Sequence, residues 1–347
     1  MQKIKVGIVG CGSITQQRHA PEYHENARAE IGGFYDVNPQ RATALCAAYG
    51  GKAYDTFEDM LADPTVQAIS ICSPNDTHCD RTVRALRAGK HVLCEKPMAQ
   101  SLQESRIMTA AQKESGKVLM IGHNQRMVAA HQKARELLLS GAIGKVLFLQ
   151  SNFKHAGPEH WSIDRTPSTW FFSKQQAGFG VLGDLGAHKL DLIRFLTGKE
   201  IKTVFATMMT LDKQTPEGEL ISLEDNAVCQ FFLDGGLPGI IHVSWTNYGY
   251  EDNSTFIYGK TGVMKIFSGY SDDIVLEMRD GSTAKYNVGA ISTNAKQVRS
   301  GIIDEFIASI LENRSPIVTG CDGHNTLAVI VSAMESYKQG RWLEVEY

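Results

Sequence analysis

The 347-residue chain lacks several features that would assign it to other classes of protein. It has no apolar run long enough to cross a bilayer, so we do not expect a membrane protein. Acidic and basic residues are interspersed and sum to a net charge of −3, which leaves no basic stripe to bind nucleic acid or anionic lipid. The N-terminal residues have neither the charged region nor the cleavage site of a signal peptide, and we therefore expect a cytoplasmic protein.

Paired cysteines, repeats and phosphate loops are also lacking. The seven cysteines include no C-x-x-C pair typical of a metal site, and several lie in apolar segments, so we expect reduced, structural thiols and no bound metal. No repeat of fixed period and no low-complexity tract is present. The Gly-Lys-Thr-Gly run at residues 259–262 does not have the Walker spacing and predicts a hairpin turn.

The beginning of the chain has the order expected of a dinucleotide-binding unit. A β-rich run at residues 3–9 precedes Gly10 and Gly12, and a segment able to form a helix follows. Gly10 permits a tight turn, Gly12 lets the backbone approach a pyrophosphate, and the helix N-terminus attracts that anion. Asp36 ends the second apolar run about 20 residues beyond the glycines, where a ribose-binding carboxylate belongs. Thr15 stands at the third glycine position, and the alternative is an ordinary strand-to-helix turn with a solvated Asp36.

Two domains are predicted from the pattern of strands and helices. Residues 1–122 alternate strands with helices, which is typical of an α/β domain with a doubly wound parallel sheet. In this domain we expect Asn38 to cap one helix, and Ser101 with Glu104 to form a capping box. Residues 123–347 contain consecutive strands and few helices, which predicts an α+β domain with an antiparallel sheet. Its expected strands are 146–151, 203–209, 227–233, 240–245, 255–258, 263–267 and 274–278, and its expected helices are 127–139, 184–196, 302–311 and 325–338.

The Glu-Lys-Pro run at residues 95–97 is the first candidate for chemistry. It follows the strand predicted at residues 91–94, and so it lies at the carboxyl edge of the sheet, where ligands bind. Lys96 could hydrogen-bond a substrate oxygen there, and its ammonium group would stabilise the alkoxide that develops as a hydride leaves. The alternative interpretation is a solvated surface turn that happens to precede a proline.

Asp184, His188 and Asp191 form the second candidate, because their spacing places them on one face of a helix. A histidine titrates near neutral pH, so His188 could act as the general base for an alcohol proton. In the simpler alternative, Asp184 is an N-cap and His188 is a packed histidine with satisfied hydrogen bonds. No cysteine or histidine cluster supports a zinc site at Asp184 and His188.

Two further groups are candidate substrate contacts. Arg126 follows the last predicted strand of the first domain and lies at the domain junction, where it could bind a ligand or hold the domains together. Trp161, Trp170 and Phe179 could shape a pocket, or they could belong to the core or to an interface.

Several short motifs occur in a specific order along the chain. They are Gly10-Cys11-Gly12, Asp36 with Arg41, Ser73-Pro74-Asn75 with His78, Glu95-Lys96-Pro97, and Asp184-Leu185-Gly186-Ala187-His188-Lys189-Leu190-Asp191. In this order they resemble the Gfo/Idh/MocA family of glucose-fructose oxidoreductase, inositol dehydrogenase and rhizopine-catabolism proteins. The resemblance spans nearly the whole chain.

The resemblance implies an N-terminal Rossmann domain and a C-terminal domain whose open, mainly antiparallel sheet supports a homodimer or homotetramer. It matches Lys96 to a catalytic lysine, often followed by a cis peptide bond, and His188 to the usual acid or base. It matches Asp184 to a residue that orients this histidine or grips the substrate, whereas Phe179 interrupts a glycine run of the family. The cofactor is expected to contact Gly10, Gly12, Ser13, Ile14, Asp36, Arg41, Ser73, Asn75, His78, Glu95 and Lys96, and the substrate is expected to contact Lys96, Arg126, Trp170, Asp184 and His188.

The resemblance also implies NAD- or NADP-linked chemistry on sugars or polyols. Asp36 favours NAD, because a carboxylate accepts the ribose hydroxyls and repels a 2′-phosphate, but Arg41 leaves NADP open. We therefore predict an NAD(P)-dependent oxidoreductase that moves a hydride between nicotinamide and a secondary alcohol or ketone of such a small molecule. The alternatives are a glycoside hydrolase that uses tightly held NAD and a cofactor-binding regulator without turnover; the presence of Lys96 and His188 argues against the regulator.

Overall fold

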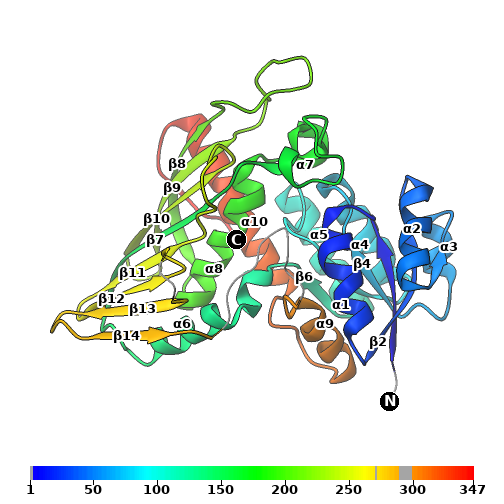
Figure 1. The fold of residues 1–347 in the computed structure, drawn as a ribbon, viewed down its shortest axis with the longest axis horizontal. Helices are drawn as coiled ribbons and strands as arrows, with labels where there is room; N and C mark the ends of the chain where they lie inside the picture. Colours follow the sequence, from blue (N-terminus) through cyan, green and yellow to red (C-terminus); the bar gives the residue numbers. More distant parts are fainter. Residues whose placement is uncertain (1–2, 270–271, 289–298) are drawn as a thin grey trace.

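The computed structural model describes residues 3–269, 272–288 and 299–347. Within these residues, two β-sheets stand side by side, and helices α8 (Ala187–Thr197) and α10 (Gly320–Gln339) run between them (Figure 1). The smaller sheet belongs to the N-terminal part of the chain and the larger sheet to the C-terminal part, so the chain forms an α/β unit followed by an α+β unit.

The smaller sheet is the parallel, doubly wound sheet that the sequence predicted. Its described strands follow the order β3-β2-β1-β4-β5-β6, and all neighbouring strands are parallel. The strands are β1 (Ile4–Val9), β2 (Ala29–Tyr35), β3 (Lys52–Ala53), β4 (Ala68–Ile71), β5 (His91–Cys94) and β6 (Leu119–Ile121). The helices are α1 (Ala20–Glu25), α2 (Pro39–Tyr49), α3 (Phe57–Ala62), α4 (His78–Arg87) and α5 (Leu102–Ser115).

Local capping explains where two of these helices begin. The Asn38 side chain accepts a hydrogen bond from the Gln40 amide at the start of α2, and Pro39 occupies the first turn. Ser101 and Glu104 form the predicted capping box at the start of α5. Both predictions are confirmed.

The larger sheet is mixed, not purely antiparallel. Its described strands follow the order β14-β13-β12-β11-β7-β10-β9-β8-β15, and β10 runs parallel to β7 while the other neighbours are antiparallel. The sheet is therefore mainly antiparallel, as predicted, and β10–β7 is the parallel pair among its described strands. The strands are β7 (Val146–Lys154), β8 (Ile201–Met209), β9 (Asn226–Leu233), β10 (Leu237–Ser244), β11 (Thr255–Gly259), β12 (Gly262–Ile266), β13 (Ile274–Met278), β14 (Thr283–Tyr286) and β15 (Leu343–Glu344).

The predicted turn at residues 259–262 joins β11 and β12 as an antiparallel hairpin, so that prediction is confirmed. The remaining helices are α6 (Ala129–Leu139), α7 (Lys174–Ala177) and α9 (Ile302–Leu311). Two-residue strands such as β3 and β15 carry no usable periodicity, which is why the sequence did not indicate them. No helix of residues 3–269, 272–288 and 299–347 has both the length and the apolar character needed to cross a membrane.

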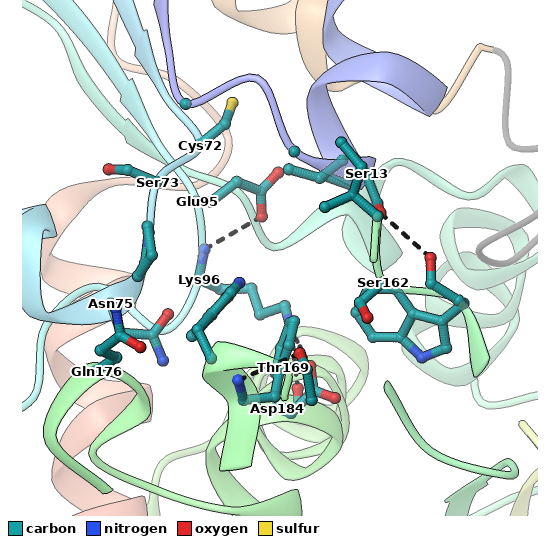
Figure 2. Close-up of a pocket in the computed structure, with 18 of the residues that line it drawn as sticks. Ser13, Cys72, Ser73, Asn75, Glu95, Lys96, Ser162, Thr169, Gln176 and Asp184 are labelled. Carbon is teal, nitrogen blue, oxygen red and sulfur yellow. Dashed lines mark hydrogen bonds and ion pairs between the residues drawn. The ribbon is translucent and has the colours of Figure 1, made fainter. Parts of the chain in front are cut away.

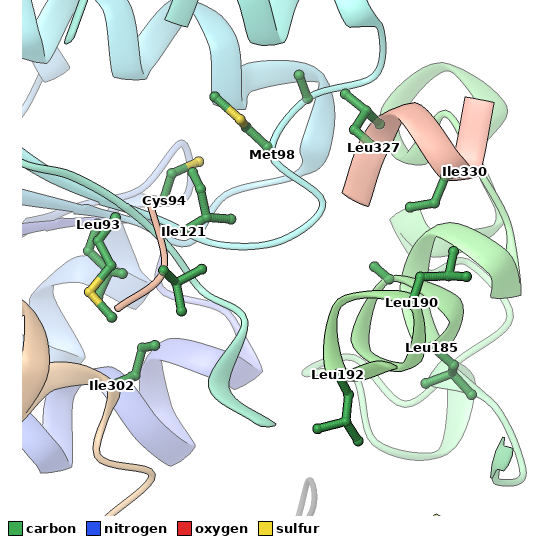
Figure 3. Close-up of a cluster of buried hydrophobic side chains, with 14 of the residues drawn as sticks. Leu93, Cys94, Met98, Ile121, Leu185, Leu190, Leu192, Ile302, Leu327 and Ile330 are labelled. Carbon is green, nitrogen blue, oxygen red and sulfur yellow. The ribbon is translucent and has the colours of Figure 1, made fainter. Parts of the chain in front are cut away.

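The C-terminal helices return to the first sheet. A Cβ added at Gly323 of α10 would lie 2.7 Å from the Ile121 side chain and 3.0 Å from the Met98 sulfur, so α10 packs directly against this sheet. Figure 3 shows apolar side chains of α8 and α10, including Leu190 and Ile330, within the same buried cluster. The two parts of the molecule therefore share one continuous apolar core across their junction.

Candidate active site

A pocket of about 370 Å³ lies where the carboxyl ends of the parallel strands face the second domain. This is the position at which doubly wound sheets bind ligands. The predicted site residues that line it are Gly10, Gly12, Ser13, Ile14, Asp36, Arg41, Ser73, Asn75, His78, Glu95, Lys96, Trp170, Asp184 and His188. Arg126 is not part of this lining.

The glycine turn at the end of β1 has the shape that a dinucleotide needs. Gly10 has a φ of +88°, and a Cβ there would lie 2.7 Å from the Ser73 amide nitrogen. A Cβ at Gly12 would meet nothing within 4 Å, so the backbone at this point faces open space within the pocket. The buried Thr15 hydroxyl donates a 2.5 Å hydrogen bond to the Gly10 carbonyl. The residue that departs from the glycine pattern thus closes the turn, and the turn fits a pyrophosphate.

Asp36 lies at the end of β2 with a fixed carboxylate. One oxygen accepts a 2.6 Å hydrogen bond from the Cys11 amide, and the other accepts a 2.8 Å bond from the Asn38 amide. These bonds orient the carboxylate at the edge of the pocket, where it can accept hydrogen bonds from a ribose.

His19 and Glu95 form a buried ion pair at the end of β5, which the sequence did not indicate. The two ring nitrogens of His19 lie 2.8 Å from the Ser70 hydroxyl and 2.8 Å from the Glu95 carboxylate. Burial lowers the pKa of His19, but its neighbours Cys72 and Glu95 outweigh burial and raise the pKa above the usual value. The histidine is therefore protonated and holds Glu95 as a carboxylate. His19 lies in the helical segment that follows the glycine turn. No sequence pattern distinguishes it there from an ordinary core histidine.

Lys96 and Asp184 meet across the domain junction. The Lys96 Nζ donates to Asp184 Oδ1 at 2.6 Å and to the Asp184 carbonyl at 3.1 Å. Figure 2 shows the lysine reaching from the end of β5 toward Asp184. The buried Trp245 indole donates to the second oxygen of Asp184 at 3.1 Å. The Lys96–Pro97 peptide bond is cis, as the resemblance implied.

Asp184 and His188 lie on one continuous helical segment, as predicted. Its first part, Leu182–Gly186, is a π-helical turn that leads directly into α8, and Gly198 ends the helix in the left-handed conformation. Asp184 is not an N-cap, because its carboxylate bonds to Lys96 and Trp245 instead of to a backbone amide of this helix. The simpler alternative for Asp184 was therefore wrong.

His188 is a neutral imidazole that lines the pocket. Burial, reinforced by the positive charge of Lys96, lowers the pKa of His188 well below its usual value. Among the residues that the structure describes, none hydrogen-bonds its Nδ1 atom. A neutral histidine beside a lysine and a dinucleotide-shaped groove can accept a proton from a substrate.

Both parts of the chain match known protein families. Residues 4–123 match the family described as "Oxidoreductase family, NAD-binding Rossmann fold", and residues 131–265 match the "GFO/IDH/MocA C-terminal domain". The chain belongs to the Gfo/Idh/MocA family. It is an NAD-binding oxidoreductase with an N-terminal Rossmann domain.

Similar members of the Gfo/Idh/MocA family cover nearly the whole chain. The levoglucosan dehydrogenase of Pseudarthrobacter phenanthrenivorans is 25% identical over 99% of this chain and 99% of its own length. The inositol 2-dehydrogenase of Rhizobium meliloti is 27% identical, also over 99% of both chains. Among solved structures, the aldose-aldose oxidoreductase from Caulobacter crescentus complexed with glycerol has a TM-score of 0.84 and 27% identity over 99% of this chain and 100% of that one. Levoglucosan dehydrogenase in complex with NADH has a TM-score of 0.89 at 23% identity, over 99% of this chain and 100% of that one, which shows the fold.

A second histidine of this Gfo/Idh/MocA protein lines the pocket without having been predicted. His155 follows β7, and its Nδ1 accepts a 3.0 Å hydrogen bond from the Gly157 amide. Burial lowers the pKa of His155 to about 4, so the ring is neutral and its single proton lies on Nε2. The Phe153 ring lies 5.7 Å from the His155 ring and 5.6 Å from the His188 ring, between centroids. An isolated histidine after a strand carries no sequence pattern that could have revealed this placement.

The structure does not bring Arg126 to the pocket. Its guanidinium donates to both oxygens of Asp191 at 2.8 and 2.6 Å, and to Asp322 at 3.0 Å. These partners lie on α8 and α10, so Arg126 ties the helices of the junction together. Asp191 extends the predicted face of Asp184 and His188, but it faces Arg126 and is only 1% exposed.

Aromatic side chains of the second domain form one wall of the pocket. Trp161, Trp170, Phe171 and Phe179 line it, and the Trp170 and Phe171 rings stack with centroids 3.9 Å apart. Trp161 meets Phe171 edge-on at 5.0 Å. The prediction that Trp161, Trp170 and Phe179 could shape a pocket agrees with this placement.

Proposed function

We propose that this protein uses NAD to oxidise a secondary alcohol of a sugar or polyol, or to reduce the corresponding ketone. The observation that carries the proposal is the meeting of Lys96, Asp184 and His188, from two domains, beside the dinucleotide groove. The names of the relatives, which include levoglucosan dehydrogenase and inositol 2-dehydrogenase, support a polyhydroxylated substrate.

In this proposal NAD, when bound, supplies the hydride acceptor, and the residues of the chain supply binding and proton transfer. The Lys96 ammonium donates a hydrogen bond to the substrate hydroxyl and stabilises the negative charge that develops on its oxygen. Asp184 and Trp245 fix the lysine, because the carboxylate is held from both sides. His188 accepts the hydroxyl proton as the carbon loses its hydride, and ketone reduction reverses both transfers.

The cofactor contacts follow from the same arrangement. The open backbone at Gly12 and the helix that begins at Ser13 and Ile14 would hold the pyrophosphate. Asp36 would accept the ribose hydroxyls at the adenosine end. Ser73, Asn75, His78 and Glu95 line the pocket toward Lys96 and would surround the nicotinamide end.

We also propose a homodimer or homotetramer formed through the face of the larger sheet that lies away from the helices. Phe148, Val228 and Ile240 border a hollow on this sheet, and Phe232 and Trp342 are each 41% exposed. Apolar surface of this kind is commonly covered by a second subunit. Light scattering coupled to gel filtration would give the mass, and a monomer at every concentration would contradict this part of the proposal.

The test of the activity is a screen of polyols, aldoses, glycosides and sugar phosphates for reduction of NAD by the purified protein. Wild type is compared with Lys96→Met and His188→Gln, which are expected to bind NADH but to lose most turnover. Release of free sugar from a glycoside without net NAD reduction would favour hydrolysis. NADH binding with no turnover on any substrate, and no reaction in the ketone direction, would favour the regulator.

A further inference from the structure

The second domain reaches across the cofactor groove at its adenosine end. The Ser13 hydroxyl donates a 3.2 Å hydrogen bond to the Trp161 carbonyl, and Arg41 Nη2 donates a 2.8 Å bond to the Asp164 carboxylate. Arg41 and Asp164 are 123 residues apart in sequence, yet both line the pocket together with Asp36. The surroundings of the adenosine ribose are therefore built from both domains.

Arg41 is the cation placed to receive a 2′-phosphate. Of the lysine and arginine side chains that line the pocket in the described residues, Lys96 pairs with Asp184 and Arg18 lies 3.9 Å from Glu95, both at the opposite end. Arg41 is on the first turn of α2, a few residues after Asp36, which is where an arginine that accommodates the NADP phosphate belongs. Recognition of NADP by this chain would thus depend on a free Arg41 guanidinium.

We propose that Asp164 is a cofactor-specificity residue, which selects NAD over NADP by occupying the Arg41 guanidinium and by adding a second negative charge beside Asp36. A dianionic phosphate at this place would meet two carboxylates and an arginine whose charge is already paired. The ribose hydroxyls of NAD carry no charge and need only Asp36. The inference rests on NAD binding in this groove and not on the identity of the substrate.

The exposure of the pair makes Asp164 suitable for substitution. The Arg41 side chain is 31% exposed and the Asp164 side chain is 58% exposed. Exposed ion pairs contribute little to folding stability, so removal of the Asp164 charge will leave the fold intact. A bound phosphate would be only a few ångströms from the guanidinium, so the same removal has a larger effect on NADP affinity.

The experiment measures the dissociation constants of NADH and NADPH by nicotinamide fluorescence, without any substrate. The variants are Asp164→Asn, Asp164→Glu, Arg41→Ala and the double variant Asp164→Asn with Arg41→Ala. Asp80→Asn is the matched control, because Asp80 also pairs with an arginine on an exposed helix surface, at 3.2 Å from Arg84, but does not line the pocket.

We expect wild type to bind NADH more tightly than NADPH. Asp164→Asn will tighten NADPH binding about tenfold, from the loss of one unit charge beside the phosphate and the release of the Arg41 guanidinium, and will change NADH binding by less than about twofold. Asp164→Glu, which keeps the charge, and Asp80→Asn will retain the wild-type preference. The gain for NADPH will be smaller in the Arg41→Ala background, because only the repulsion by Asp164 is relieved there and no guanidinium is freed for the phosphate.

Three results would overturn the inference. They are equal affinities of wild type for the two cofactors, an unchanged NADPH affinity in Asp164→Asn, and a gain for NADPH that is as large without Arg41 as with it. Failure of wild type to bind NADH at all would instead contradict the cofactor site itself, so the two failures are distinguishable.

Discussion

Lys96 Nζ and Asp184 Oδ1 are 2.6 Å apart, and they join the end of a parallel strand in the first domain to a π-helical turn in the second. The side chains are 13% and 8% exposed, so water screens the pair only weakly. The lysine is thereby held in one position before any substrate binds, and an oriented donor of this kind does not have to be reorganised during the reaction.

Replacement of Lys96 by Met tests this role. The variant removes the donor to the substrate oxygen, and we expect kcat/KM to fall by about 10²–10³, the usual effect of losing one such donor. The dissociation constant of NADH should change only slightly. Lys202→Met removes a lysine from an exposed ion pair with Asp234 and serves as the control. Near-normal turnover of Lys96→Met would contradict the assignment.

The pH dependence of alcohol oxidation tests His188. Protonation of a general base abolishes its function, and burial lowers the pKa of His188 below its usual value. The loss of kcat/KM on acidification should therefore occur below the ordinary histidine pKa of about 6.5, so the rate stays level through that pH. The measurement is kcat/KM between about pH 5 and pH 9, with His188→Gln as the control. An acid limb centred at or above the ordinary value would be the contrary result.

The two glycines of the turn should respond differently to the same substitution. Gly10→Ala places a Cβ 2.7 Å from the Ser73 amide at a φ of +88°, so we expect a lower melting temperature. Gly12→Ala places a Cβ in open space within the groove, so we expect an unchanged melting temperature and NADH affinity reduced about tenfold. Thermal unfolding and NADH titration of both variants provide the comparison, and each variant is the control for the other.

Arg126→Met should reduce stability without affecting substrate binding. It leaves the buried Asp191 carboxylate without its bidentate partner, which costs about 3–5 kcal/mol of unfolding free energy. Denaturant unfolding would measure this cost, and KM would be measured at a temperature where the variant is folded. A raised KM in the folded variant would show that Arg126 does contact the substrate.

Short-range signals predicted much of the fold. The Asn38 cap and the Ser101–Glu104 box are both found where the sequence indicated them, because each depends on residues within one turn of helix. The π-helical start of the Asp184 segment was not indicated. Side-chain periodicity does not distinguish a π turn from an α turn over five residues.

The site residues that belong to ordered sequence motifs were predicted, and isolated site residues were not. The glycine turn, Asp36, Lys96, Asp184 and His188 all line one pocket. His19 and His155 were missed, because an isolated histidine has no pattern around it and acquires its partners only through packing.

The sequence by itself determined the local turns, the helix ends and the set of motif residues, since these follow from interactions between near neighbours in the chain. The alternation of strands and helices indicated the parallel sheet. Only the tertiary structure decided which distant residues meet. It paired Lys96 with Asp184 and Arg41 with Asp164, and it turned Arg126 away from the pocket. The physical reason is that such contacts depend on how two sheets and the helices between them pack, and packing is set by the shape of the whole apolar core.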